Sequence, residues 1–126
     1  MSLYLDTQVV VWLAGGRADK LSSAAAAAIE ESEVFISPMV ILELEYLFEI
    51  KRIVKPPLML LNQLETQIGL KQRDHSFSAV IQTALFETWT RDPFDRVIVA
   101  HARTDAMSPL VTSDEKIREN YPLSVW

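Results

Sequence analysis

Residues 92–102 read DPFDRVIVAHA, with two acidic residues within four positions and an apolar run behind them. Pro93 suits the first position of a helix, so Asp92 is the natural N-cap, whose carboxylate accepts backbone N–H bonds. Asp95 also suits the first helical turn. On a helical wheel of about 100° per residue, however, Asp95 shares the arc of the apolar residues. We therefore predict that Asp95 points inward, toward a sheet, and that Asp92 is mainly structural.

The rest of the chain alternates between short apolar runs and helix-forming segments. The apolar runs predict strands at residues 3–6, 34–37, 108–114 and 123–126. Caps, prolines and glycines predict helices at residues 7–15, 22–33, 38–51, 58–68, 75–89 and 92–106. Alternation with short connections is typical of the α/β class, in which helices cover a parallel sheet.

The composition limits which folds and which kinds of metal site the chain can form. With 126 residues, 49% of them hydrophobic, the chain is long enough for one globular domain over residues 1–126. No apolar run approaches the ~20 residues of a membrane span. Cysteine is absent, which excludes disulfides and thiolate metal sites, so any metal would be held by oxygen or histidine. We expect a cytoplasmic protein with no membrane association.

The net charge of −5, taken alone, argues against nucleic-acid binding, because such proteins usually carry a basic footprint. Four acids gathered around a metal would account for most of this charge. Basic clusters at residues 50–55 and 70–75 could still meet phosphates, although solvated helix ends explain any single one of them. The charge therefore does not exclude RNA as a partner.

Glu43 is the most informative acid of the expected helix 38–51. On the wheel it falls inside a broad apolar arc, between Leu47 and Ile50, whereas the other acids of the helix fall on the side that water can reach. A buried carboxylate needs a cation, a hydrogen-bond partner or a raised pKa. A tilted helix or an arginine partner in the core would also explain Glu43.

Two more acids follow predicted strands at opposite ends of the chain. Asp6 ends the first strand, and Asp114 comes directly after LVTS at residues 110–113. In open parallel sheets the ligand crevice lies beyond the carboxyl ends of the strands, so these acids could meet there. Aspartate is also a common cap and turn former, which explains either residue taken singly.

Together, Asp6, Glu43, Asp95 and Asp114 predict a metal site. Clustered carboxylates raise one another's pKa unless a cation intervenes. Hard divalent ions such as Mg²⁺ or Mn²⁺ prefer oxygen ligands and keep several waters. The chemistry that suits this set is phosphodiester hydrolysis, in which the metal polarises a phosphoryl oxygen and a carboxylate orients the attacking water.

The chain resembles the PIN domain nucleases, and within them the VapC-like toxin ribonucleases of bacterial toxin–antitoxin pairs. The matching segments are YLDTQVVVWLA (4–14), ISPMVILELEYL (36–47), RDPFDRVIVAHA (91–102) and PLVTSDEKI (109–117). The resemblance implies an α/β/α sandwich with a central parallel sheet of four to five strands. It also implies an endoribonuclease that cuts RNA with Mg²⁺ or Mn²⁺, a homodimer, and a small antitoxin whose tail covers the site.

By match to the family, Asp6, Glu43 and Asp95 would be metal-site acids, with Asp6 and Asp95 the firmest direct ligands. Asp114 would be the fourth acid, often acting through water. Two positions depart from close relatives, because Leu42 stands where tryptophan is usual and Thr90 where histidine is frequent. Neither change removes a proposed ligand, but both bear on the fit of a substrate or partner.

Several other residues have both a functional and an ordinary interpretation. Thr7 and Ser113 flank the acids and could orient water or phosphate, although capping explains them too. Contacts to RNA are conceivable for Arg91, Arg96, Trp12, Trp89 and Trp126, against surface ion pairs and core packing as the ordinary interpretation. We interpret His75 and His101 as turn and packing residues.

Two other classes of function stay open at this point. One is a non-catalytic interaction domain on the same scaffold. The other is a phosphatase with an aspartyl nucleophile at the end of the first strand, but that chemistry normally needs a second acid two residues later, where Gln8 stands. The RNA target, the number of metal ions and the oligomeric state do not follow from the sequence.

Overall fold

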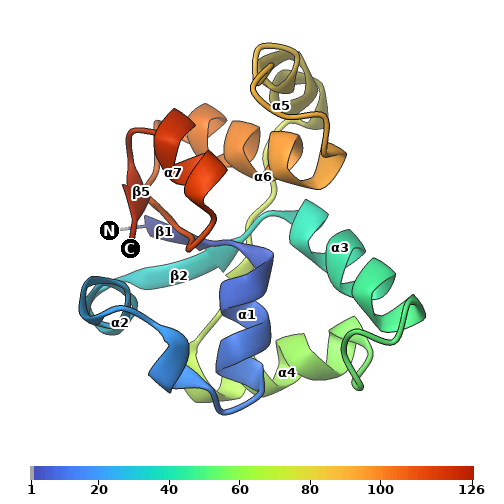
Figure 1. Cartoon of the computed structure of the whole chain (residues 1–126), viewed down its shortest axis with the longest axis vertical. Coiled ribbons are helices and arrows are strands. Elements are labelled where there is room, and N and C mark those ends of the chain that lie inside the picture. The colour runs from blue at the N-terminus through green and yellow to red at the C-terminus, as the bar shows by residue number, and fades with distance from the viewer. Residues whose placement is uncertain (1) are drawn as a thin grey trace.

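The computed structural model describes residues 2–126. Its centre is a parallel sheet of five strands in the order β3-β2-β1-β4-β5 (Figure 1). The strands are β1 (Ser2–Leu5), β2 (Glu33–Ile36), β3 (Lys71–Gln72), β4 (Leu110–Val111) and β5 (Ser124–Val125). The sheet confirms the predicted α/β class, and its five strands agree with the predicted four to five.

Helices lie on both sides of the sheet and complete the α/β/α sandwich (Figure 1). They are α1 (Thr7–Ala14), the 3₁₀ turn η1 (Ala18–Lys20), α2 (Ser23–Glu31), α3 (Pro38–Glu49), α4 (Pro57–Ile68), α5 (Phe77–Ala84), α6 (Pro93–Thr104) and α7 (Glu115–Asn120). Within residues 2–126, every helix is too short or too polar to cross a membrane.

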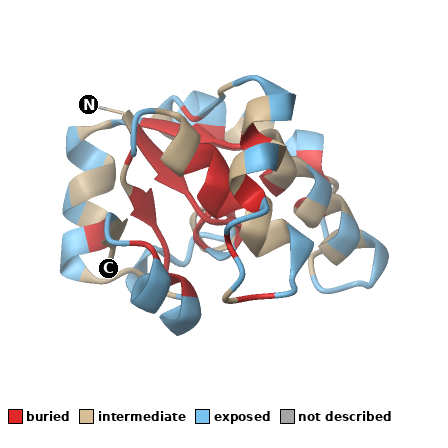
Figure 2. Cartoon of the chain, turned by 90° about the horizontal axis from the view of Figure 1, so that it is seen from above, coloured by how far each residue is buried: buried red, intermediate tan, exposed pale blue. Residues whose placement is uncertain are grey.

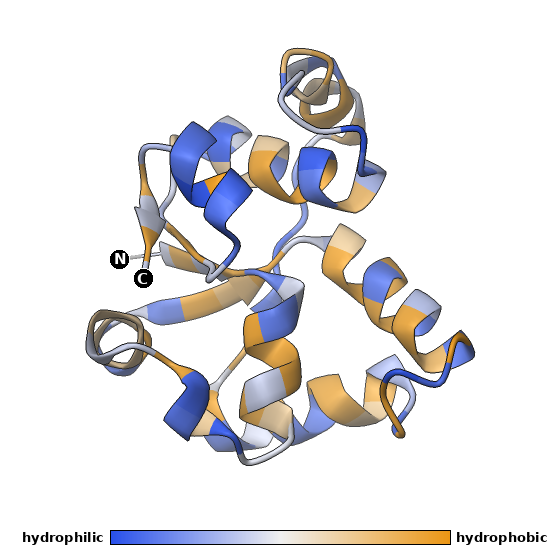
Figure 3. Ribbon diagram, viewed as in Figure 1, coloured by the Kyte–Doolittle hydropathy of each residue, from blue (hydrophilic) through white to orange (hydrophobic). Residues whose placement is uncertain are grey.

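The central strands are buried on both faces, as a parallel sheet requires. Leu3, Tyr4 and Leu5 of β1 are each at most 2% exposed, and both residues of β4 are fully buried. Figure 2 shows this buried layer running through the middle of the chain, and Figure 3 shows that β1 and β2 are largely apolar whereas α7 is largely hydrophilic. The core therefore fixes the position of the carboxyl ends of β1 and β4.

Four helices begin near this carboxyl edge, and each has a polar N-cap that accepts a backbone N–H bond. The caps are Asp6 for α1, Ser37 for α3, Asp92 for α6 and Asp114 for α7. Pro38 and Pro93 occupy the first turns of their helices, where a missing N–H costs nothing. Figure 1 shows the starts of these helices around one region of the fold.

Two sequence predictions needed correction, and three short elements were missed. The helix expected over 75–89 ends at Ala84, because Glu87 turns inward, is 4% exposed, and bonds to Arg103 and Trp89. The strand expected over 108–114 is only Leu110–Val111. The short elements β3, η1 and α7 were not predicted, since two to six residues are too few to show a period.

The end of α6 adopts an unusual backbone. Ala106 and Met107 have φ values of 54° and 55°, in the left-handed region that side chains disfavour. The helix end is nevertheless well bonded, since Met107 N donates to Arg103 O and Ser108 N to Ala102 O. These bonds redirect the chain from α6 into β4 at a local conformational cost.

Candidate active site

Asp6 is the buried centre of the acidic region. It follows β1 and is 7% exposed. Its Oδ1 accepts the backbone N–H of Thr7 at 2.8 Å, and its Oδ2 accepts the hydroxyl of Thr112 at 2.7 Å. Burial raises the pKa of Asp6, these two hydrogen bonds lower it, and the charges of Asp114 and Asp92 raise it again. The position of this carboxylate is therefore fixed by both β1 and the end of β4.

Thr112 joins Asp6 to Asp114. It is fully buried one residue after β4, and its hydroxyl oxygen also accepts the backbone N–H of Asp114 at 3.1 Å. Asp114 then caps α7 by accepting the N–H of Ile117 at 2.9 Å. Because Asp114 is itself exposed, it lies at the rim of the acidic region.

Thr7 joins Asp6 to Glu43 in the same manner. Its backbone N–H bonds to Asp6, and its hydroxyl donates to Oε1 of Glu43 at 2.5 Å. Glu43 is half-buried, and its pKa is raised by burial, lowered by the Thr7 bond, and raised by the charges of Asp6 and Asp92. Hydrogen bonds thus connect Glu43, Thr7, Asp6, Thr112 and Asp114 across three helices and two strand ends.

Asp95 faces this chain of bonds but takes no part in it. It lies in the first turn of α6, is half-buried, and accepts no hydrogen bond within residues 2–126. Burial, followed by the charges of the four acids Asp92, Asp6, Asp114 and Glu43, raises the pKa of Asp95 to about 8. A carboxyl group in the field of four others, from four different segments, lies in the same site as they do.

No cation of the described residues offsets these charges. The ion pairs within residues 2–126 are Arg17–Asp19, Arg73–Asp105 and Arg103–Glu87, none of which involves a site acid. Across residues 2–126, no three carboxylate or imidazole groups are arranged closely enough to hold a metal ion by themselves. The donor set consists of oxygens alone. It therefore suits a hydrated hard ion, held partly through its waters, better than an ion enclosed by protein ligands.

The structure also shows which of the ambiguous polar residues bond to the site acids. Thr7 bonds to the site acids, whereas Ser113 makes no hydrogen bond with its side chain in the described chain, and the neighbouring Thr112 has that role instead. Thr112 was missed because a threonine after a strand is ordinary. Asp92 was interpreted as a cap, which it is, but its charge also acts on Asp95.

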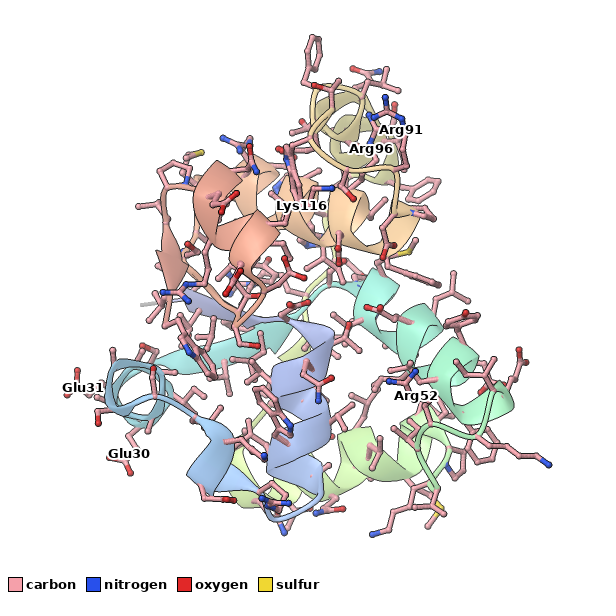
Figure 4. The ribbon with its side chains drawn as sticks, in the orientation of Figure 1. Glu30, Glu31, Arg52, Arg91, Arg96 and Lys116 are labelled. Atoms are coloured by element: carbon pink, nitrogen blue, oxygen red, sulfur yellow. The ribbon has the colours of Figure 1, made fainter. Side chains whose placement is uncertain are left out.

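The basic and aromatic candidates have mainly structural contacts. Arg96 donates to the carbonyls of Ala84 and Leu85 at the end of α5, and Arg91 donates to Thr88 O. Figure 4 shows both arginines near the α5–α6 connection.

The tryptophans and histidines are also largely engaged within the fold. Trp12 packs against Trp126 with ring centroids 5.9 Å apart, and Trp89 donates to Glu87. His101 is buried against Tyr4, as predicted for a packing residue.

Comparison with known proteins identifies the family. Residues 3–121 match the PIN domain, so the chain belongs to the PIN domain family. Its fold is similar to a chain in the crystal structure of VapBC2 from Rickettsia felis bound to a DNA fragment from their promoter. That match has a TM-score of 0.69 and 19% sequence identity, and it covers 100% of both chains. No curated protein matches the sequence.

Proposed function

We propose that this protein is a metal-dependent endoribonuclease, a hydrolase of RNA phosphodiester bonds, and the toxin of a type II toxin–antitoxin pair. The observation that carries the proposal is the carboxylate of Asp95, half-buried and without a hydrogen bond in the field of four other acids. Such an arrangement is unfavourable for folding alone, which is typical of sites kept for chemistry. Membership of the PIN domain family supports the same conclusion.

Each residue has a distinct task in this proposal. Asp6 and Asp95 would hold Mg²⁺ or Mn²⁺ directly, with Glu43 and Asp114 contributing alongside them or through water. When bound, the ion would polarise a phosphoryl oxygen and lower the pKa of a water molecule. Asp95 has oxygens free of bonds to the chain, so it is the acid available to orient that water or accept its proton.

The test is cleavage of a 5′-labelled single-stranded RNA by the purified protein. We expect cleavage with Mg²⁺ or Mn²⁺, none with EDTA, and none after Asp95→Asn. Asp19→Asn is the matched control, because Asp19 is an exposed acid of η1 that is paired with Arg17 and makes no bond to a site acid. Cleavage that survives Asp95→Asn would come from a contaminant and would refute the assignment.

An antitoxin partner is part of the proposal, supported by the VapBC2 assembly that the similar structure contains. An apolar hollow of about 370 Å³ lies beside α1 and the connection between α3 and α4, and two cations, Arg52 and Lys55, line it. Figure 4 shows Arg52 near that connection. A partner segment with apolar residues and a carboxylate would suit this surface.

The antitoxin can be sought as a protein encoded beside this one. Co-expression with the product of a neighbouring short reading frame should give a complex in which cleavage is suppressed. Arg52→Glu should weaken that complex and leave cleavage by the free protein unchanged. An equally stable complex with Arg52→Glu would exclude this surface.

We further propose that the protein is a cytoplasmic homodimer that forms a single PIN domain per chain. The exposed apolar side chains on α3 and α5 support self-association, among them Leu42, Tyr46 and Phe77. Sedimentation equilibrium measures the oligomeric state directly.

A second candidate is a non-catalytic interaction domain on the same scaffold. It is favoured by one observation, that the described residues contain no arrangement of three ligands ready to hold a metal. Calorimetric titration with Mn²⁺ separates the two functions. Binding that Asp6→Asn abolishes supports the nuclease, and the absence of binding supports the interaction domain.

A further inference from the structure

A polar pocket with an aromatic wall adjoins the acidic site on the side of α7 and β5. Its volume is about 380 Å³, and it opens where α7 packs beside β5 (Figure 1). The residues that line it are Glu115, Arg118, Glu119, Ser124 and Trp126. We call it the Trp126 pocket. Its volume lies within the range of roughly 300–1,000 Å³ that is typical of ligand pockets.

Two connections along the chain place the Trp126 pocket next to the acidic site. Glu115 directly follows Asp114, the N-cap of α7. On the other side, Thr112 donates its backbone N–H to the carbonyl of Val125 at 3.2 Å, and Trp126 is the next residue. A single-stranded RNA with a phosphate at the site acids would therefore pass the pocket with one of its neighbouring nucleotides.

The indole ring of Trp126 provides a stacking surface. The residue is half-buried and packs against Trp12 of α1, with ring centroids 5.9 Å apart and ring planes inclined by 38°. This contact restricts the orientation of the ring, which still lines the pocket. Bases of single-stranded RNA stack on aromatic side chains held in this way, because every base has a π-face.

Three charged side chains of α7 face the same pocket. Glu115, Arg118 and Glu119 are spaced by three and four residues, so they share one side of the helix, and all three are exposed. None of them takes part in an ion pair within residues 2–126. Two carboxylates against one guanidinium leave a negative balance, which disfavours a phosphate group and favours an uncharged base.

Glu119 is the carboxylate that helix stability does not explain. Glu115 lies in the first turn of α7, where the helix dipole favours an acid. Glu119 lies in the last turn, where the dipole disfavours negative charge and favours a cation such as Arg118. An acid retained at this position, beside an aromatic ring, suits the binding of a hydrogen-bond donor.

Guanine is the base that matches this set of groups. Its Watson–Crick edge carries two adjacent donors, N1–H and the N2 amino group, and a carboxylate can accept from both. Beside them lies the acceptor O6, to which a guanidinium donates. Adenine, cytosine and uracil each lack the pair of adjacent donors.

We propose that the Trp126 pocket binds a guanine base of the RNA, next to the nucleotide whose phosphate lies at the acidic site. Trp126 stacks on the base, Glu119 accepts from N1–H and the N2 amino group, and Arg118 donates to O6. This inference rests on the RNA substrate of the proposed function and gives that substrate a base preference.

The first experiment measures base binding without cleavage. The indole N–H signals of the protein are followed by NMR in EDTA during separate titrations with GMP, AMP, CMP and UMP, and Trp126→Phe identifies the signal of Trp126 by removing it. We expect GMP to shift that signal and to bind about 10-fold more tightly than the other three nucleotides. An unmoved Trp126 signal, or equal binding of all four nucleotides, would overturn the proposal.

Two substitutions separate stacking from base recognition in the same titrations. Trp126→Ala should weaken GMP binding by about 10-fold, and Trp126→Phe should retain most of the affinity. Glu119→Gln should reduce GMP binding to the level of the other nucleotides. Glu49→Gln is the matched control, because Glu49 is also an exposed acid in the last turn of a helix and does not line the pocket. The same GMP affinity in Glu119→Gln and Glu49→Gln would refute the base contact, even if Trp126→Ala does not fold.

The second experiment determines the base preference from cleavage of a pool of RNAs with randomised sequence. We expect cuts at a fixed spacing from a guanosine, and we expect Glu119→Gln to abolish that preference. Cleavage by the wild type without a guanosine preference would overturn the proposal and leave the nuclease assignment intact. Selective GMP binding by a protein that cuts no RNA would support the pocket and refute the nuclease assignment.

Discussion

Buried and half-buried carboxylates occur in two regions of this protein, and their surroundings are opposite. At the far end of α6, Asp105 lies 3.3 Å from Arg73, and Glu87 lies 2.7 Å from Arg103. At the carboxyl edge of the sheet, none of the acids has a cationic partner from the described residues. The two acids at the far end of α6 are therefore paired with arginine, whereas the acids at the carboxyl edge of the sheet are not.

The pKa values follow the same division. The hydroxyl of Tyr4, bonded at 2.6 Å, and then Arg73 hold the pKa of Asp105 below its ordinary value. Burial and neighbouring acids raise the pKa of Asp95 to about 8. The contrast shows that burial alone does not decide the charge state of an acid, because the partners provided by the chain can reverse the shift.

Replacing one acid in each region by asparagine is the most direct test of the difference between the two regions. We expect Asp95→Asn to lower RNA cleavage by roughly 10²- to 10³-fold, as for the loss of one preorganised group, and to raise the melting temperature of the metal-free protein at pH 8. Asp105→Asn should lower the melting temperature and leave cleavage unchanged. Cleavage assays and calorimetry on the same preparations measure both. If the two variants changed cleavage and melting temperature in the same way, the two regions would not differ in function.

Thr112→Val tests how far the acidic site depends on a single hydroxyl. The change keeps the shape of the side chain but removes its hydroxyl. That hydroxyl donates a hydrogen bond to Asp6 and accepts one from the backbone N–H of Asp114. Hydrogen bonds to charged groups contribute about 1.5–3 kcal/mol, so we expect cleavage to fall about 10-fold or more. Without this bond the pKa of Asp6 should rise further, which moves the pH–rate profile to higher pH. Thr112→Ser retains the hydroxyl and should restore both rate and profile.

The two regions should also respond oppositely to pH. The pKa of Asp95 is about 8 in the fold, against an ordinary value of about 3.9. Its contribution to stability is thus fully present below pH ~4 and lost as the pH rises through about 8. In EDTA, we expect the melting temperature to fall between pH 5 and pH 9, and Mg²⁺ to reverse the loss. Asp105, with its lowered pKa, contributes stability that is lost on the acid side.

A melting curve in EDTA that stays flat over the same pH interval would contradict this expectation. The Asp95→Asn variant serves as the internal control, because it lacks the titrating group and should show little dependence on pH in that range. Its response to Mg²⁺ should be correspondingly small.

The smallest expected effect concerns the turn that follows the paired region. Ala106 has a φ of 54°, which costs a non-glycine residue about 1–2 kcal/mol, whereas glycine costs about 0.5–1 kcal/mol in unfolded-state entropy. Ala106→Gly should therefore stabilise the protein by roughly 0.5 kcal/mol, or about 2 °C in melting temperature. A decrease in melting temperature would show that the local bonds offset the backbone cost.

The sequence predicted the elements that carry a repeating pattern. The apolar arc around Asp95, the inward position of Glu43 and the cap-plus-proline starts of α3 and α6 all depend on spacing within one segment, and the structure agrees with them. Spacing within a segment is visible in a single chain because helical periodicity is local.

What could not be predicted depends on contacts between distant segments. The bond from Thr112 to Asp6 joins residues 106 positions apart, and no local pattern marks that threonine among others. The early end of α5 depends on Glu87 meeting Arg103, again across the fold. The lack of a hydrogen-bond partner for Nε2 of His101 follows only once the helices around it are placed.

The sheet ends on either side in a strand of only two residues, β3 and β5. Such short borders present almost no free backbone to another polypeptide, so strand addition and fibrous stacking are disfavoured. A macromolecule that recognises this protein would therefore do so through side chains on helices and loops rather than through strand pairing. Its associations should accordingly be easy to alter by single substitutions, without rebuilding the sheet.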